Sequence, residues 1–183
     1  MYVTQRVRKM SDPGRCVVIS LLVLLAGCAT GSLQKRDDMY QMAVAMEKWV
    51  IQFPARGFEV QTADHSKPYY FFTNDKSGLA VSFNFDEARR CKDSESCRDY
   101  LADRQKATLS YKKNWRMTKI GDVYVSENMN GPIEGMDLRQ QHMNAHYVKG
   151  WIWIDVHLSK VNYRNSDRQL FVDFVRSIQI RDK

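Results

Sequence analysis

The clearest hydrophobic pattern in the chain is an alternation with a period of two. Apolar residues at 79, 81, 83 and 85 alternate with small or polar residues at 80, 82 and 84. Such alternation predicts a strand with one buried face. An aromatic run, Tyr69-Tyr70-Phe71-Phe72, precedes it, and the residues between, Asn74-Asp75-Lys76-Ser77-Gly78, favour a loop. We therefore predict a β-hairpin over residues 69–85.

A second alternation covers residues 136–148 and 151–161, on either side of Lys149-Gly150. A two-residue turn at that dipeptide pairs Val148 with Trp151, and hence His142 with His157. This register puts the apolar residues of both strands on one face, as burial requires. The opposite face then carries polar and aromatic side chains: His142, Asn144, His146, Trp151, Trp153, Asp155 and His157.

The remaining elements are predicted from shorter patterns. Residues 39–50 suggest a short helix, followed by a strand at 49–53 that stops at Pro54. Strands are predicted at 58–62, 115–119 and 122–128, and a surface helix at 97–114. A closing helix starts at a Ser166–Gln169 capping box and has apolar residues at 170, 171, 174, 175 and 178. This order predicts an α+β fold, an antiparallel sheet of about six to seven strands with helices packed on it.

The N-terminus has the pattern of an export signal rather than of folded structure. Basic residues lie between 6 and 15, and an apolar run follows over residues 17–25. The quartet Leu25-Ala26-Gly27-Cys28 resembles the bacterial lipobox. The resemblance implies cleavage before Cys28, diacylglycerol on its sulfur, and a further acyl chain such as palmitate on the new amine. Because Ala29 is not aspartate, it further implies the outer membrane of a Gram-negative cell, facing the periplasm. The alternative is a simple anchor helix with an incidental cysteine.

This interpretation divides the chain and changes its charge. It gives a signal peptide at 1–27, a lipidated tether at 28–47 that is partly helical, and a single α+β domain at 48–183. The full chain has a formal net charge of +7. Cleavage would leave 156 residues with 24 basic and 20 acidic side chains, a net charge of +4. The basic character therefore owes much to the leader, and we expect no nucleic-acid partner.

Two cysteines, Cys91 and Cys97, remain in the exported domain. The five residues between them are polar and turn-prone. A metal pair and a redox pair are alternatives, but the spacing is not Cys-x-x-Cys and no other thiol remains to complete a thiolate site. In an oxidising compartment we favour a structural disulfide.

Several segments in order resemble the Mog1/PsbP-like α/β/α sandwich, over roughly residues 48–180. They are the Phe53–Phe58 turn, the 69–85 hairpin, the middle helix, the strand at 151–160 and the helix at 170–178. That fold occurs in photosystem-associated proteins, a Ran-binding protein and bacterial envelope lipoproteins. The resemblance implies a binding or assembly protein without a catalytic site, and it supplies no set of site residues.

Candidate chemistry is confined to the polar face of the second hairpin. No Gly-x-Ser-x-Gly, phosphate-binding loop, dinucleotide fingerprint or His-Glu-x-x-His motif occurs. Paired strands bring His142 and His157 close, and Asp155 lies on the same face. His146 lies roughly 13 Å from His142 along the strand, too far to share a mononuclear site. Candidate ligand-binding residues are therefore His142, Trp153, Asp155 and His157.

The sequence favours a non-catalytic lipoprotein that binds an envelope protein and needs no cofactor. The alternative is a small-ligand or metal-binding module at His142, Asp155 and His157, with tighter binding above the histidine pKa near 6.5. A hydrolase using a histidine base ranks last, because no suitable nucleophile is visible. A basic run, Arg104, Lys106, Lys112, Lys113, Arg116 and Lys119, is interpreted as a solvated helix face rather than an anionic-lipid site.

Overall fold

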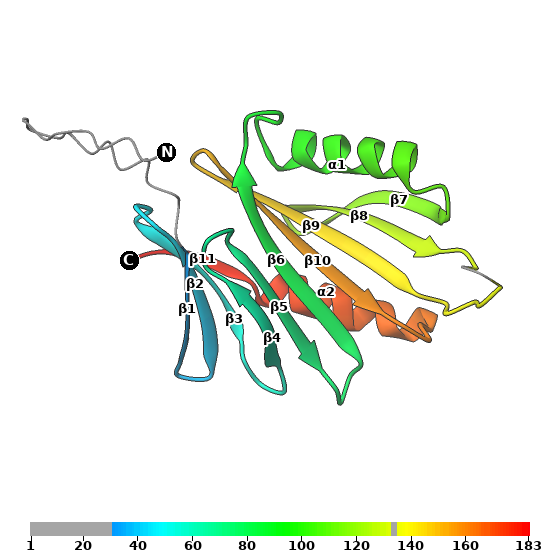
Figure 1. Ribbon diagram of the computed structural model, residues 1–183, viewed down its shortest axis with the longest axis horizontal. Coiled ribbons are helices and arrows are strands. Elements are labelled where there is room, and N and C mark those ends of the chain that lie inside the picture. Colours follow the sequence, from blue (N-terminus) through cyan, green and yellow to red (C-terminus); the bar gives the residue numbers. More distant parts are fainter. Residues whose placement is uncertain (1–30, 133–134) are drawn as a thin grey trace, which may run out of the picture.

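The computed structural model of the chain describes residues 31–132 and 135–183 (Figure 1). The predicted signal peptide and Cys28 lie outside the described residues. Within the described part, no helix is both long and apolar enough to cross a membrane.

A small antiparallel sheet brings the two ends of the described chain together. Its order is β1 (Gly31–Arg36), β2 (Met39–Val44), β3 (Trp49–Pro54) and β11 (Gln179–Asp182). The short helix predicted in residues 39–50 is wrong, because Tyr40, Met42 and Val44 alternate inward as strand residues. Their period-two burial outweighs the weaker helical spacing. Residues 31–44 are thus a hairpin in the fold rather than a tether.

The large sheet has seven strands, all paired antiparallel. Its order is β4 (Glu59–Asp64), β5 (Tyr69–Asn74), β6 (Leu79–Glu87), β10 (Ile152–Lys160), β9 (Gln141–Lys149), β8 (Val123–Asn130) and β7 (Lys112–Ile120). The predicted hairpins at 69–85 and around Gly150 are confirmed. The α+β class is confirmed as well.

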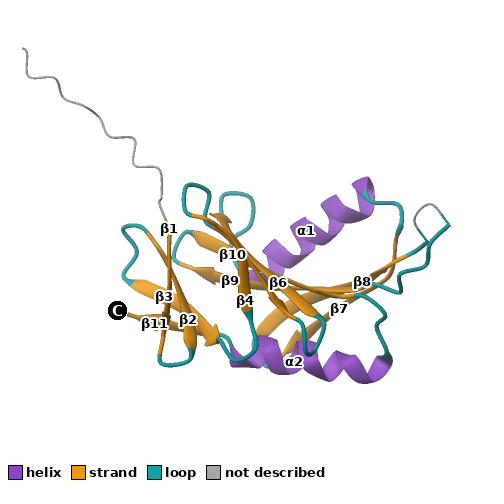
Figure 2. Ribbon diagram, turned by 60° about the horizontal axis from the view of Figure 1, so that its bottom comes forward, coloured by secondary structure: helices purple, strands orange, loops and turns teal. Residues whose placement is uncertain are grey.

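Helix α1 (Ser94–Thr108) lies over β8 and β9, on one face of the large sheet (Figures 1 and 2). It begins at Ser94 rather than at residue 97, because Asp93 and Ser96 form a capping box. It ends at Thr108 rather than at residue 114, because Lys112 already pairs with Asn130 in the sheet.

A one-turn 3-10 segment (Asn165–Asp167) leads into α2 (Arg168–Ser177), on the opposite face of the large sheet. The predicted capping box at Ser166 is wrong. The residue that precedes the helix is Asp167, and its carboxylate accepts a hydrogen bond from the backbone N–H of Arg164 at 2.9 Å.

The main core lies between the large sheet, α2 and the small sheet. Aromatic rings from four elements meet there: Phe53 stacks on Phe83 at 5.2 Å between centroids, and Phe72 and Phe174 lie 5.0 and 5.2 Å from Phe53. Aromatic clusters of this kind bury large apolar areas and carry much of the folding free energy. The opposite face of the large sheet, under α1, has a different composition and contains the predicted site.

Candidate functional site

The predicted face of the second hairpin is correct, although its register is not. Val148 pairs with Trp153 rather than with Trp151, and His142 pairs with Ser159 rather than with His157. The turn residues are Gly150 and Trp151, and Gly150 has φ +62° at the position where a type II′ turn needs glycine. The shift is two residues, an even number, so the side chains of both strands keep their predicted faces. Trp151 is the exception among the residues predicted on the polar face, because it lies in the turn and lines a hollow with Val44 and Ile152.

His142 and His157 still meet, as a diagonal pair across β9 and β10. Their rings are 14° from parallel, and His142 Nδ1 lies 2.9 Å from His157 Nε2. Burial lowers the pKa of His142 to about 3, with further lowering from His157 and Lys112. Burial and Lys112 lower the pKa of His157 to about 4. Both rings are therefore neutral at pH 7, and one donates a hydrogen bond to the other.

A second cluster forms around Asp155. Trp153 Nε1 donates to His146 Nδ1 at 3.3 Å, and Asn144 Nδ2 donates to Asp155 at 3.0 Å. His146 Nδ1 lies 3.7 Å from an Asp155 oxygen. Burial lowers the pKa of His146 to about 3 and raises that of Asp155 to about 6; the Asn144 hydrogen bond and the charge of Lys112 partly oppose the rise. Asp155 therefore keeps its proton to a higher pH than an exposed aspartate does.

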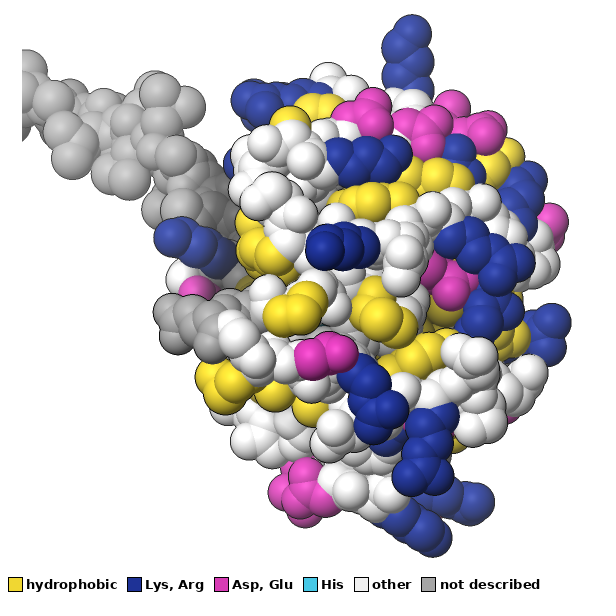
Figure 3. Space-filling view, turned by 90° about the vertical axis from the view of Figure 1, so that its right-hand side faces the viewer, with side chains coloured by type: hydrophobic (Ala, Val, Ile, Leu, Met, Phe, Trp, Pro, Cys, Tyr) yellow, Lys and Arg dark blue, Asp and Glu magenta, His cyan; other side chains and the backbone are white. Residues whose placement is uncertain are grey.

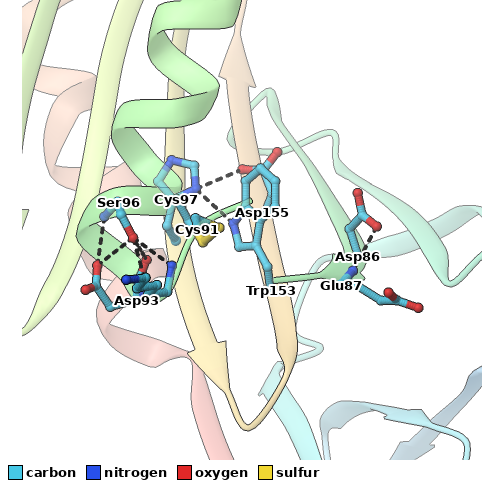
Figure 4. Close-up of a disulfide and its surroundings, with 10 residues drawn as sticks. Asp86, Glu87, Cys91, Asp93, Ser96, Cys97, Trp153 and Asp155 are labelled. Carbon is cyan, nitrogen blue, oxygen red and sulfur yellow. Dashed lines mark hydrogen bonds and ion pairs between the residues drawn. A yellow bond between two sulfur atoms is a disulfide. The ribbon is translucent and has the colours of Figure 1, made fainter. Parts of the chain in front are cut away.

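The disulfide predicted between Cys91 and Cys97 is present and holds α1 onto this face. The two Cα atoms are 4.8 Å apart, and both cysteines are buried. Figure 4 shows the disulfide beside Trp153, with the Asp93–Ser96 cap of α1 next to it. The cysteines and Trp153 form a small core of their own, and Tyr100 packs edge-on against the indole. The helix thus covers the end of the polar face where Trp153 and His146 lie.

Several buried polar atoms under α1 have no hydrogen-bond partner among the described residues. They are His142 Nε2, Asn144 Oδ1, His146 Nε2 and both amide atoms of Asn128. Within the same residues, no three His, Cys, Asp or Glu side chains are grouped closely enough to hold a metal ion. The predicted trio is divided, because His142 and His157 bond each other while Asp155 bonds Asn144. The geometry gives the metal hypothesis no support.

A cleft of about 630 Å³ opens between α1 and the β6 side of the sheet. Trp153 and Asp155 line it, whereas His142 and His157 do not. Its other walls are Asn84, Asp86, Glu87, Arg89, Arg90, Cys91, Tyr100, Leu101 and Arg104. The sequence reasoning missed Tyr100, whose hydroxyl accepts a 2.8 Å hydrogen bond from Arg90. Only the packing of α1 over the sheet brings these residues together.

The basic run is divided between α1 and the edge strand β7. Figure 3 shows lysine and arginine side chains spread over the right-hand end of the molecule in Figure 1, where β7 lies. Lys113, Arg116 and Lys119 are exposed on β7, and charged side chains on an edge strand oppose pairing with other chains. Lys112 differs, because its ammonium is half-buried and donates to Gln105 at 3.1 Å. Burial lowers the pKa of Lys112.

Comparisons with known proteins support a fold for this chain but no function. No protein-family model matches the chain, and no curated protein matches it. The cyanobacterial PsbP protein CyanoP from Synechocystis sp. PCC 6803 matches with a TM-score of 0.50 at 12% identity, covering 85% of this chain and 95% of CyanoP. A crystal structure from Bacteroides thetaiotaomicron VPI-5482 matches with a TM-score of 0.48 at 12% identity over 74% of this chain; this chain spans 46% of that protein. The chain therefore has a PsbP-like fold, as its order of elements predicted.

Proposed function

We propose that this chain is a non-catalytic, lipid-anchored lipoprotein of the Gram-negative cell envelope, held in the outer membrane with its domain in the periplasm, where it binds a partner protein. The observation that carries the proposal is the lipobox-like quartet ending at Cys28, three residues before the first strand of the fold at Gly31. A lipid at Cys28 would keep the domain at a membrane surface. The disulfide is consistent with export to an oxidising compartment.

The chemistry of the polar face supports a binding role rather than a catalytic one. His142 and His157 use ring nitrogens on each other and are neutral at pH 7. In the described part of the chain, no serine, threonine or free cysteine hydrogen-bonds to either ring. The described residues therefore provide no hydroxyl or thiol nucleophile paired with a histidine base, and the two rings have the geometry of a packed polar core.

The surface best suited to a partner is the open part of the same face. Helix α1 packs on β8 and β9, and the cleft beside it is lined by residues of β6. There Asn84 is exposed on β6, and the cleft beside it combines Tyr100 with charges of both signs. Tyrosine and arginine are the residues most enriched at protein interfaces, with tryptophan.

Lipid anchoring is tested on the protein isolated from its own membranes. Mass spectrometry of the N-terminal peptide should show an acylated Cys28, and Cys28→Ser should release the protein from the membrane fraction. Cys91→Ser provides a control that removes a different cysteine and should leave the protein membrane-bound. An unmodified Cys28 in a membrane-derived sample would refute the proposal.

Partner binding is tested by photo-cross-linking in intact cells. A photoreactive amino acid at Asn84 should give a discrete cross-linked product, whereas one at Arg176, exposed on α2 at the opposite face, should not. Products of equal yield from both positions would argue against a specific interface on the β6 side.

The cleft also favours a second candidate, the binding of a small polar ligand. Its volume of about 630 Å³ suits a small molecule, and Trp153 and Asp155 line it. The pH dependence differs from the sequence-based expectation, because His142 and His157 do not change charge near pH 6.5. Native mass spectrometry of protein purified without added metal should show a bound organic mass that Arg104→Ala removes. A bare protein mass would leave partner binding as the better proposal.

A further inference from the structure

Two large apolar side chains protrude from turns at one end of the molecule. Met46, in the turn between β2 and β3, is 95% exposed, and Trp151, in the turn between β9 and β10, is 51% exposed. In Figure 1 both turns lie at the upper left, at the end of the molecule where the chain enters β1. We name this end, defined by Met46, Trp151, Lys48 and Lys67, the entry end.

Contacts place the start of β1 at this end. Gly31 pairs with Val44 and donates its backbone N–H to the carbonyl of His65 at 2.8 Å. Val44, Pro68 and Trp151 in turn line one shallow hollow of about 110 Å³, whose other walls are Phe85, Ile152 and the acidic side chains of Asp86 and Glu87. Gly31, the first residue that the structure describes, therefore lies beside the β4–β5 turn and near Trp151.

The distance from the proposed lipid to the fold is short. Cys28 precedes Gly31 by three residues, and a fully extended chain spans at most about 3.6 Å per residue, so the two are within about 11 Å. A lipid on Cys28 must lie in the membrane. The entry end is therefore held close to the headgroup region, which is about 5–8 Å thick in each leaflet.

The exposed apolar residues at the two turns add little to the stability of the fold, but they are favourable for contact with a membrane. Met46 has φ +67°, a left-handed conformation that glycine or asparagine adopts with less strain than methionine. Its side chain is almost wholly exposed, so packing does not compensate for the strain. Tryptophan is enriched at membrane–water interfaces, where its ring lies at the level of the headgroups.

We propose that the entry end docks into the headgroup region of the leaflet that holds the Cys28 lipid. Met46 and Trp151 insert as apolar contacts, and Lys48 and Lys67 lie at the level of anionic headgroups. This inference rests on the proposed lipid anchoring and adds an orientation to it. The proposed anchor carries several acyl chains and holds the protein in the membrane by itself, so the second contact at the domain surface serves to fix how the domain faces the membrane.

Fluorescence quenching tests the contact. The lipidated full-length protein is reconstituted into vesicles of phosphatidylethanolamine and phosphatidylglycerol with brominated acyl chains, which quench tryptophans close to the acyl region. We expect quenching that falls by about half or more in Trp151→Phe, because the ring lies at the interface. Trp115→Phe is the matched control: Trp115 lies on β7, at the far end in Figure 1, and its loss should leave the quenched signal unchanged.

Methionine variants separate membrane contact from folding. Met46→Asn should leave the melting temperature unchanged or slightly higher, since asparagine tolerates the left-handed conformation, and should reduce the quenching of Trp151. Met136→Asn is the matched control, because Met136 is also exposed (60%) but lies in the loop between β8 and β9. It should not change the quenching.

The outcomes distinguish this inference from the proposed function. Intact mass spectrometry of the same sample reports lipidation. An acylated protein whose Trp151 is not quenched overturns the docking and leaves the anchor in place. A protein without acyl chains at Cys28 overturns the proposed function itself. Protection of Trp151 only after addition of envelope proteins would identify a protein interface and overturn membrane docking.

Discussion

The buried histidines make the stability of this domain sensitive to mild acid. In the folded chain the pKa values of His142, His146 and His157 are about 3, 3 and 4, whereas an unfolded histidine titrates near 6.5. A group whose pKa is lowered by folding stabilises the fold above its unfolded pKa. That stability is lost as the pH falls below about 6.5, because the unfolded chain then binds protons that the folded chain does not.

The magnitude follows from the same pKa values. Between pH 7 and pH 5, each buried imidazole should lose about 2 kcal/mol of its contribution. Asp155 acts in the opposite sense, because its folded pKa of about 6 exceeds the unfolded value of 3.8. The stabilisation that Asp155 provides is fully present below pH 3.8 and is lost as the pH rises through 6. Lowering the pH from 7 to 5 therefore restores about 1 kcal/mol of this stabilisation. The net loss between pH 7 and pH 5 should be about 4 kcal/mol.

Urea unfolding monitored by tryptophan fluorescence at pH 7, 6 and 5 measures this loss. His146→Gln keeps an acceptor for Trp153 Nε1 but removes one titrating group. Between pH 7 and pH 5, the free energy of unfolding of this variant should therefore fall by about 2 kcal/mol less than that of the wild type. This difference corresponds to a relative shift of roughly 1 M in urea midpoint. His65→Gln is the matched control, because His65 is exposed in the β4–β5 turn.

The reasoning would be refuted by a stability that is flat between pH 7 and pH 5. It would also be refuted if His146→Gln and His65→Gln had the same pH dependence, since only one of these side chains is buried. A change in m-value with pH would indicate a change of folding mechanism instead, so m-values are compared first.

Three further predictions concern stability at pH 7. Cys91→Ser opens a short disulfide loop and should lower the free energy of unfolding by about 2 kcal/mol in a urea titration, with no further loss on adding reductant. Arg168→Met should lower the free energy of unfolding by about 3 kcal/mol, because it leaves the buried carboxylate of Glu127 without its two hydrogen bonds of 2.6 and 3.1 Å. Restored stability in the Arg168→Met, Glu127→Gln double variant would identify the buried charge as the cause. Gly31→Ala should cost about 1–3 kcal/mol by calorimetry, since a Cβ there would overlap the Tyr70 hydroxyl; an unchanged melting temperature would show that Tyr70 moves freely.

The second hairpin shows how far sequence reasoning reaches. Alternation assigned each side chain of the two strands to a face, and for all of them except Trp151, which lies in the turn, that assignment survived a two-residue error in register because a strand repeats every two residues. The His142–His157 contact was predicted from a direct pairing and is observed across a diagonal one. Both candidate turns, Lys149-Gly150 and Gly150-Trp151, contain Gly150, and the structure places this residue, with its φ of +62°, at the first position of the turn rather than at the second.

The N-terminal segment shows where the sequence was ambiguous. Met42, Met46 and Trp49 have helical spacing, while Tyr40, Met42 and Val44 have strand spacing. The strand prevailed because its inward residues complete the core under the small sheet, together with β3 and β11 from the far end of the chain. Nothing local to residues 39–50 contains that information.

The sequence by itself determined the α+β class, the disulfide and the face on which His142, Asp155 and His157 lie, because these depend on periodicity and on the spacing of neighbouring residues. Only the tertiary structure decided which of them is accessible. Helix α1 covers one half of the face, so His142 and His146 are buried as neutral rings while Asp155 and Trp153 border a cleft with Tyr100. The physical reason is that burial and pKa depend on what packs above a strand, and the covering element comes from a distant part of the chain.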